Sequence, residues 1–289
     1  MHFALSTHLF HGERLSRHHL EIATAAGFTD LEIFATRTHF DYASEAAVAE
    51  YAALLRDVGV TVGSMHAPIC ASFVGGHWGR AFSNAASDSA RRQETIDETK
   101  RALAACQLLG ASLMVVHLGL PRGQTIPPGD NDRRAAERSL EQIAEAAVAA
   151  RVALALELIP NDLSTPTALL DWLDELEVGG AGVCLDVGHA HVMGDAPEIV
   201  EALSGQVVTT HLHDNRKVSD DHLVPFAGTV DWATTLAALW KIGYSGRLVF
   251  EVADHGDAAG VLQRTVSARG RLQGILNDLA EPFDFGQEP

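Results

Sequence analysis

The chain has 289 residues, and its 21 Lys and Arg against 38 Asp and Glu give a formal net charge of −17. A hydrophobic share of 47 %, with no long polar low-complexity tract, is enough for a packed core and excludes a disordered or fibrous protein. The strong acidity opposes broad binding to nucleic acids or anionic membranes, because both need clustered Lys and Arg. We expect neither as a partner.

The cysteines and the first residues indicate the cellular compartment. Cys70, Cys106 and Cys184 are far apart and form no C-x-x-C pair, which argues against a disulfide framework and against a thiolate zinc site. Residues 1–5 lack the basic head and apolar stretch of a secretion signal, so we expect a cytoplasmic protein. Residues 102–121 carry no charge, but Gly110 divides them into helical and strand-like parts, which argues against a membrane span.

Short apolar runs alternate with longer amphipathic stretches along the whole chain. The predicted strands are Phe3–Ser6, Asp30–Phe34, Val60–His66, Ser112–His117, Val152–Leu158, Gly182–Asp186, Val207–His213 and Arg247–Val252. Helical periodicity occupies the stretches between them, for example Ser44–Val58, Ser89–Leu109 and Arg133–Ala150. Gly59 and Gly110 follow two of these stretches, where glycine commonly ends a helix.

Such a β–α alternation fits either an open, doubly wound sheet or a closed (β/α)8 barrel. Eight units within about 250 residues favour the barrel. No GxGxxG or GxxxxGK[ST] fingerprint follows a predicted strand, which argues against a nucleotide-binding open sheet. We therefore predict a single (β/α)8 TIM barrel over residues 1–289, with an irregular tail after about residue 281.

The predicted connection from Pro68 to Asp88 is long for a loop between a strand and a helix, and it contains Phe73 and Trp78. Two interpretations stay open. The segment is either an aromatic lid over a functional site or a packed surface loop.

Ionisable residues stand where the predicted strands end, which is where a barrel carries its functional groups. The strand ends supply His66, His117, Glu157, Asp186, His211, His213 and Glu251. His211 and His213 face the same side, since side chains alternate along a strand.

Glu157 and Glu251 both follow apolar runs that we expect to be buried. A buried carboxylate costs several kcal/mol unless a cation or hydrogen bonds compensate it, and a metal ion is the simplest compensation. Oxygen and imidazole ligands without thiolate suit Mn2+, Mg2+, Co2+ or Zn2+.

The run from Gly182 to Ala190, with Asp186 and His189 at D-x-x-H spacing, resembles a signature of the xylose isomerase-like barrels. That superfamily contains sugar-phosphate isomerases and epimerases as well as endonuclease IV. The resemblance extends to His66, His117, Glu157, the H-x-H-D-N block from His211, Asp220, His222, the Asp231-Trp232 pair and Glu251. It implies a xylose isomerase-like TIM barrel.

The resemblance also implies a ligand set. A divalent metal would be bound by Glu157, Asp186, His211 and Glu251, with His189 beside it contacting the substrate. In the endonuclease branch, the further ligands of a three-metal cluster match His66, His117, His189, Asp220 and His222. Sugar-type members keep several of these histidines for substrate hydroxyls, so both uses stay open.

The first functional hypothesis is a metal-dependent isomerase or epimerase that acts on a keto-sugar or sugar phosphate through an ene-diolate. Glu157 and Glu251 would serve as base and acid on opposite faces of the substrate, and His189 would donate to the developing oxyanion. Substrate contacts are expected from His66, His117, His213, Arg216, Lys217 and His222. Arg216 or Lys217 would meet a distal hydroxyl or phosphate.

Two other activities stay open. Endonuclease IV-like hydrolysis of abasic DNA fits the ligand inventory, but the charge of −17 opposes it. The contexts Glu157-Leu158-Ile159 and His117-Leu118-Gly119 also depart from the Glu-Asn-Thr and His-Pro-Gly of that branch. A keto-sugar or keto-inositol dehydratase would use the same proton abstraction. We expect one bound ion per chain, and a homo-oligomer stays open.

Overall fold

The barrel of the chain is closed. A computed structural model describes residues 1–176 and 180–281, so the tail predicted after residue 281 lies outside the described residues. The barrel strands are β1 His2–Ser6, β2 Asp30–Phe34, β3 Thr61–His66, β6 Leu113–Val116, β7 Ala153–Glu157, β8 Gly182–Asp186, β9 Val207–Leu212 and β10 Arg247–Phe250. Each strand pairs in parallel with the next, and β10 pairs with β1. The prediction of a (β/α)8 barrel is confirmed.

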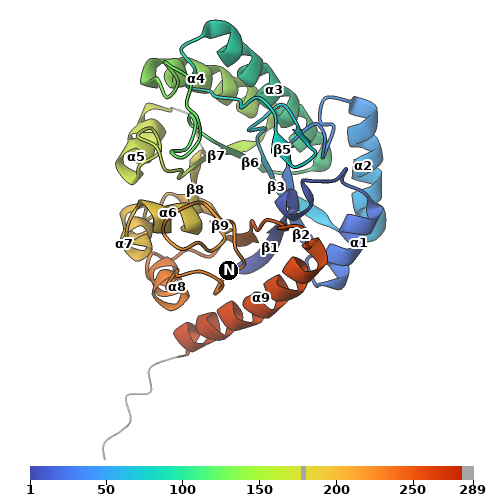
Figure 1. Ribbon diagram of the computed structural model, residues 1–289, viewed down its shortest axis with the longest axis vertical. Helices are drawn as coiled ribbons and strands as arrows, with labels where there is room; N and C mark the ends of the chain where they lie inside the picture. Colours follow the sequence, from blue (N-terminus) through green and yellow to red (C-terminus); the bar gives the residue numbers. More distant parts are fainter. Residues whose placement is uncertain (177–179, 282–289) are drawn as a thin grey trace, which may run out of the picture.

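Helices surround this barrel, as Figure 1 shows. They are η1 Thr7–Phe10, α1 Arg17–Ala25, α2 Glu45–Val58, α3 Ser89–Leu109, α4 Arg133–Ala150, α5 Pro166–Glu175, α6 Val187–Met193, α7 Ala196–Ala202, α8 Trp232–Lys241 and α9 Ala258–Ala280. Among the described helices, none is long and apolar enough to cross a lipid bilayer.

Local signals explain why the predicted helices begin and end where they do. Asp88 accepts hydrogen bonds from the first turn of α3, and Asp132 does so for α4. Helix α3 ends at Gly110, whose φ of 77° lies in the left-handed region that glycine adopts without strain. Helix α4 ends instead at Arg151, with a φ of 56°.

The apolar residues form two separate clusters. The larger one lies between strands and helices and includes Leu5, Ile33 and Leu156. The smaller one consists of Leu113, Val115, Ala155 and Cys184. Because residues two apart on a strand share a face, the side chains that follow this small cluster along β6, β7 and β8 are His117, Glu157 and Asp186.

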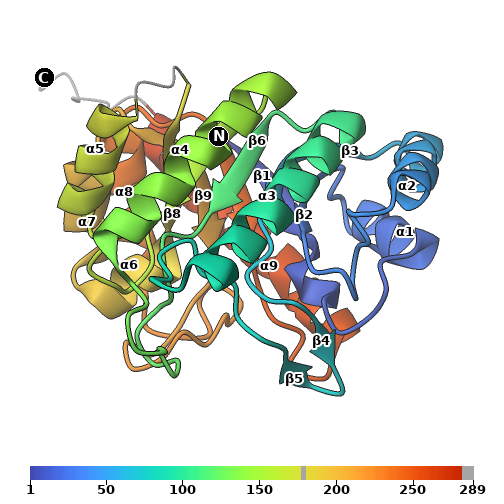
Figure 2. The same ribbon diagram turned by 90° about the horizontal axis from the view of Figure 1, so that it is seen from above.

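The long connection after β3 contains two short antiparallel strands, β4 Phe73–Val74 and β5 His77–Trp78. Figure 2 shows this hairpin projecting beyond one end of the barrel. The Trp78 ring stacks on His11 with 4.8 Å between ring centroids, and the residue is 46 % exposed. The aromatic segment therefore lies over residues that follow β1.

Candidate metal centre

Four side chains meet at the carboxyl ends of β7 to β10. Glu157, Asp186, His211 and Glu251 each offer one ligand atom, and these atoms lie within 4.8 Å of one another. His211 Nδ1 is central, at 3.0 Å from Glu157 Oε1 and 3.3 Å from Glu251 Oε2. Its distance to Asp186 Oδ2 is 3.7 Å. The set expected from the sequence is thus assembled at one point.

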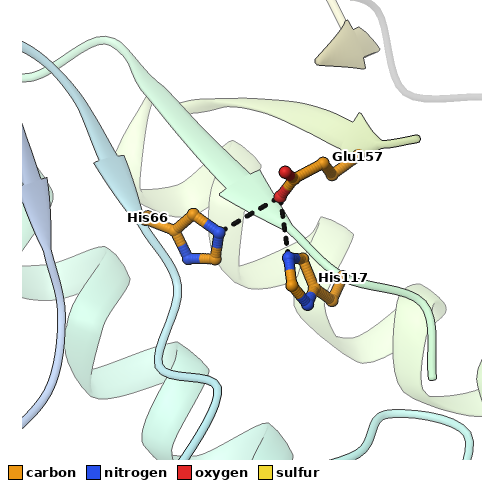
Figure 3. Close-up of side chains that lie close together, drawn as sticks. All are labelled: His66, His117 and Glu157. Atoms are coloured by element: carbon orange, nitrogen blue, oxygen red, sulfur yellow. Dashed lines mark hydrogen bonds and ion pairs between the residues drawn. The ribbon is translucent and has the colours of Figure 1, made fainter. Parts of the chain in front are cut away.

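The second oxygen of Glu157 faces two more of the expected histidines. His66 Nε2 lies 3.1 Å and His117 Nε2 lies 2.8 Å from Glu157 Oε2. Figure 3 shows both imidazole rings pointing to this one oxygen from neighbouring strands. Glu157 therefore connects the four-residue centre to a second group of possible ligands.

A third group surrounds Asp220, whose carboxylate is 34 % exposed. His189 Nε2 and His222 Nε2 lie 3.1 and 3.2 Å from Asp220 Oδ2. His213 Nε2 lies 3.5 Å from Asp220 Oδ1 and 3.1 Å from Asp186 Oδ2. All nine residues matched to possible metal ligands are therefore close to a partner carboxylate or histidine in these three groups.

The D-x-x-H spacing has a simple local cause. Asp186 ends β8 and is also the N-cap of α6, where its Oδ1 accepts a hydrogen bond of 2.7 Å from the His189 backbone N–H. His213 Nε2 lies 3.0 Å from the same oxygen and 3.1 Å from Oδ2, and Oδ2 is the oxygen that faces His211. The cap thus places His189 on the first turn of the helix, directly beside the centre.

Backbone carbonyls orient three of the histidines. Nδ1 of His66, His189 and His222 lies 2.8 to 2.9 Å from the carbonyl oxygens of Ala67, Leu158 and Glu251. A carbonyl only accepts, so each Nδ1 carries the proton. The opposite nitrogen, Nε2, is then directed toward the carboxylates.

Two buried residues near the centre went unnoticed in the sequence. Glu32 on β2 is fully buried, and its Oε1 lies 3.0 Å from His211 Nε2. The signal was available, because a carboxylate inside the apolar run of β2 is expensive unless it has a partner. His8 follows β1, and its ring lies 4.8 Å from the His222 ring. Because functional groups of a barrel lie where its strands end, the reasoning applied to the other histidines would also have identified His8.

Cys184 is also close, with Sγ within 4.8 Å of ligand atoms of Glu157 and His211. Burial holds the pKa of this thiol well above its ordinary value. A protonated thiol is a weak metal ligand. The expectation from the sequence that no thiolate zinc site forms stays a prediction.

Arg216 and Lys217 are not part of this assembly. Both residues are exposed, and Arg216 donates to the Ala227 carbonyl oxygen at 3.4 Å. Lys217 has a φ of 66°. Neither forms an ion pair with the clustered carboxylates among the described residues, so their expected substrate contacts stay a proposal.

Electrostatics couple the buried groups of the metal-free protein. Burial by itself raises the pKa of Glu157, but His117 and His211 outweigh it and hold the pKa well below its usual range. Burial lowers the pKa of His211, yet Cys184 and the carboxylates including Glu251 raise it well above its ordinary value. The free protein therefore balances these carboxylates with histidine protons, which a bound metal would displace.

The donor set fits a divalent ion. Glu157, Asp186 and Glu251 are at most 3 % exposed. Among the described residues they pair only with histidines, and no Lys or Arg neutralises them. Three converging carboxylates repel one another unless a cation or protons separate them. Oxygen and imidazole donors suit Mn2+, Mg2+, Co2+ or Zn2+.

Comparison with known proteins identifies the family. Residues 20–271 match the family described as xylose isomerase-like TIM barrel, and the chain belongs to it. A relative in Methanocaldococcus jannaschii, MJ1311, is 31 % identical over 127 residues, which are 42 % of this chain and 43 % of that protein. The Sinorhizobium fredii protein y4fM is 27 % identical over 167 residues, covering 56 % and 53 % of the two chains. The match thus spans about half the length of these relatives.

Solved structures share the fold over the whole chain. A D-tagatose 3-epimerase-like protein has a TM-score of 0.79 at 23 % identity, covering 96 % of this chain and 98 % of its own. An L-ribulose 3-epimerase has a TM-score of 0.75 at 18 % identity, with both chains fully covered. At these identities the likeness shows the (β/α)8 barrel fold.

Proposed function

We propose that this protein is a divalent-metal-dependent isomerase or epimerase of a keto-sugar or sugar phosphate. The observation that carries the proposal is the convergence of Glu157 and Glu251 on His211, from strands that β8 and β9 separate. Two carboxylates that approach one point from different strands can serve the two faces of a bound substrate. Inversion at a carbon next to a carbonyl requires that a proton leaves from one face and another arrives from the opposite face.

A divalent ion bound by Glu157, Asp186, His211 and Glu251 would polarise a carbonyl group and acidify the adjacent C–H bond. Glu157 and Glu251 would then remove the proton and return one from the opposite face, through an ene-diolate. His189 in its imidazolium form, with Nδ1 donating to the Leu158 carbonyl, would donate to the developing oxyanion from Nε2, which faces Asp220 at the mouth of the centre.

Related structures support a sugar substrate. Proteins that share the barrel include a D-tagatose 3-epimerase-like protein, a D-psicose 3-epimerase and an L-ribulose 3-epimerase. All three names describe chemistry at the carbon next to a ketose carbonyl. The buried acid and base candidates of this chain, Glu157 and Glu251, suit the same proton transfer.

The test is a solvent-exchange assay with the metal-loaded and the chelated protein. Free and phosphorylated ketoses, including D-tagatose, D-psicose and L-ribulose, are incubated in D2O with Mn2+ or Co2+. We expect one of them to gain deuterium next to the carbonyl and to be converted to its epimer or isomer. Chelation should abolish the conversion. A dehydrated product would indicate the dehydratase chemistry instead, and no turnover of any ketose would contradict the proposal.

A second candidate is an endonuclease IV-like phosphodiesterase, since the nine possible ligands form overlapping groups. His66, His117 and Glu157 form one such group, and His213, Asp220 and His222 form another. This arrangement could hold more than one ion. Cleavage of duplex DNA at an abasic residue by zinc-loaded protein would favour this activity over sugar epimerisation.

A further inference from the structure

His211 is oriented differently from the other histidines of the centre. His66, His189 and His222 turn Nδ1 to a backbone carbonyl and Nε2 to the carboxylates. His211 turns Nδ1 to the centre instead, and its Nε2 lies 3.0 Å from Glu32 Oε1. Nε2 and Glu32 Oε1 are both buried without a hydrogen-bond partner among the described residues, and their 3.0 Å approach is an ion-pair contact whose angle departs from that of a hydrogen bond. Among the described residues, the group that faces the Nε2 side of the His211 ring is therefore the Glu32 carboxylate.

A second contact holds Glu32 through its other carboxylate oxygen, Oε2. Its Oε2 accepts a hydrogen bond of 2.7 Å from the Ser64 hydroxyl. The Arg247 guanidinium donates to the same hydroxyl oxygen at 2.5 Å, and it pairs with Asp30 at 2.7 Å. Gly63 leaves the space for Arg247, since a Cβ there would lie 2.5 Å from the guanidinium carbon. A polar chain thus runs through the barrel interior from Arg247 to His211.

This chain explains how a full carboxylate is tolerated inside the barrel. Glu32 is 0 % exposed and has no Lys or Arg in direct contact among the described residues. It is stabilised by the imidazole on one side and by the hydroxyl that Arg247 polarises on the other. Replacing a carbonyl partner by a carboxylate makes an imidazole more basic and fixes its tautomer with Nε2 protonated. That tautomer leaves the Nδ1 lone pair to a metal ion.

We propose that Glu32 is a positioning residue of the metal centre, which orients His211 and strengthens its Nδ1 as a ligand. The inference rests on the metal-binding part of the proposed function. Strand β2 supplies none of the four ligands, and in this proposal it influences the metal affinity through Glu32.

Titration of the metal-free protein with Co2+ tests the proposal without any substrate. Glu32→Leu removes both the charge and the acceptor, and we expect a loss in Co2+ affinity of about 10- to 100-fold. Glu32→Gln keeps an acceptor oxygen, so its loss should be smaller. The matched control is Asp30→Asn, which also alters a partner of Arg247 on β2 but leaves His211 untouched. Asparagine keeps an acceptor oxygen for the Arg247 guanidinium, so the link through Ser64 to Glu32 persists and the affinity should change by less than about twofold.

A double-mutant cycle separates positioning from a general effect on stability. In a His211→Ala background, Glu32→Gln should cause no further loss of Co2+ affinity, because the ring that Glu32 orients is gone. The visible absorption bands of bound Co2+ should change in Glu32→Leu and stay unchanged in Asp30→Asn. Equal affinity losses in the presence and absence of His211, or unchanged affinity in both Glu32 variants, would overturn the proposal.

Failure of the proposed function would give a different result from failure of the Glu32 proposal. A protein whose Co2+ affinity depends on Glu32 but which converts no ketose would refute the sugar chemistry and leave the role of Glu32 intact. A wild-type protein that binds no divalent ion would refute both.

Discussion

At the scale of single residues, the proposed function gives Glu157 two conflicting duties, one as a metal ligand and one in proton transfer. One of its oxygens faces His211, and the other faces His66 and His117, so the carboxylate is shared between a ligand role and a proton-transfer role. Contacts with several histidines give the Glu157 carboxylate a well-defined orientation. It accepts a proton only when its hydrogen bonds and any bound cation leave a lone pair accessible.

Substitution by glutamine separates these duties. Glu157→Gln and Glu251→Gln each keep a coordinating oxygen but lose the base, so metal binding should persist in part while proton transfer falls about 100-fold or more. His189→Asn should weaken catalysis with the metal retained, because His189 is outside the four-residue set. Deuterium incorporation and metal content are measured on the same samples. Full turnover by both glutamine variants would contradict the assignment of acid and base.

A buried histidine outside the centre also contributes to the response to acid. His39 is fully buried, its Nδ1 donates to the Glu13 carbonyl at 2.6 Å, and burial lowers its pKa to about 4. In the unfolded chain the pKa is near 6.5, so between these values the unfolded state binds more protons. The folded state is therefore favoured above pH 6.5 and loses up to about 3 kcal/mol as the pH falls through this window.

His39→Asn keeps a donor for the Glu13 carbonyl and removes this titration. We expect its free energy of unfolding to fall less steeply between pH 7 and 4 than that of the wild type, measured by urea unfolding of the metal-free protein. The control is His18→Gln, which replaces an exposed histidine. A slope in His39→Asn equal to that of the wild type would show that His39 is not the group responsible.

At the scale of elements, the junction of β8 and α6 connects the fold to the site. Asp186 is the last residue of the strand and the N-cap of the helix, and it also belongs to the proposed ligand set. The cap accounts for the three-residue spacing between Asp186 and His189. The first-turn N–H that is capped belongs to His189, so the histidine comes three residues after the aspartate.

The helix-capping role of Asp186 and its proposed metal-binding role can be measured separately. Asparagine is as good an N-cap as aspartate, whereas alanine is not, so Asp186→Asn should be more stable than Asp186→Ala by about 1 kcal/mol. Both variants lose the charge and should bind Co2+ similarly poorly. Thermal unfolding of the metal-free proteins and Co2+ titration provide the two measurements. Identical stability of the two variants would argue against the cap.

At the scale of the whole molecule, the proposed ligands join four adjacent strands, β7 to β10, at one rim of the barrel. Metal binding there would stabilise the folded state, because the unfolded chain does not hold the four groups together. The aromatic hairpin stands at the edge of the barrel, with Trp78 against His11. Its role as a lid stays a prediction.

Metal should therefore raise the unfolding temperature. At a concentration 100 times the dissociation constant, a single ion adds about 2.7 kcal/mol to the free energy of unfolding, and chelation removes this gain. We expect close to one ion per chain, measured by elemental analysis and differential scanning calorimetry of untagged protein. A content near three zinc ions per chain, together with cleavage of abasic DNA, would support the endonuclease-like alternative.

Strand and helix positions were already determined by local patterns. The predicted bounds of β2 and β8 agree with the structure, as do those of α3 and α4, while the remaining predicted strands differ by one or two residues at their ends. His117 and Glu251 lie just beyond β6 and β10 instead of inside them. Periodicity and capping residues act over a few neighbours, and a single sequence contains that information.

Which side chains meet was decided only by closure of the barrel. The sequence placed histidines and carboxylates at strand ends, but the contact of Glu157 with His66, across β6, depends on how neighbouring strands are staggered. The contact of Glu32 with His211 joins residues 179 positions apart across the barrel interior. No local sequence pattern predicts this contact. The cost of burying Glu32 is offset by His211, which only the three-dimensional fold brings near.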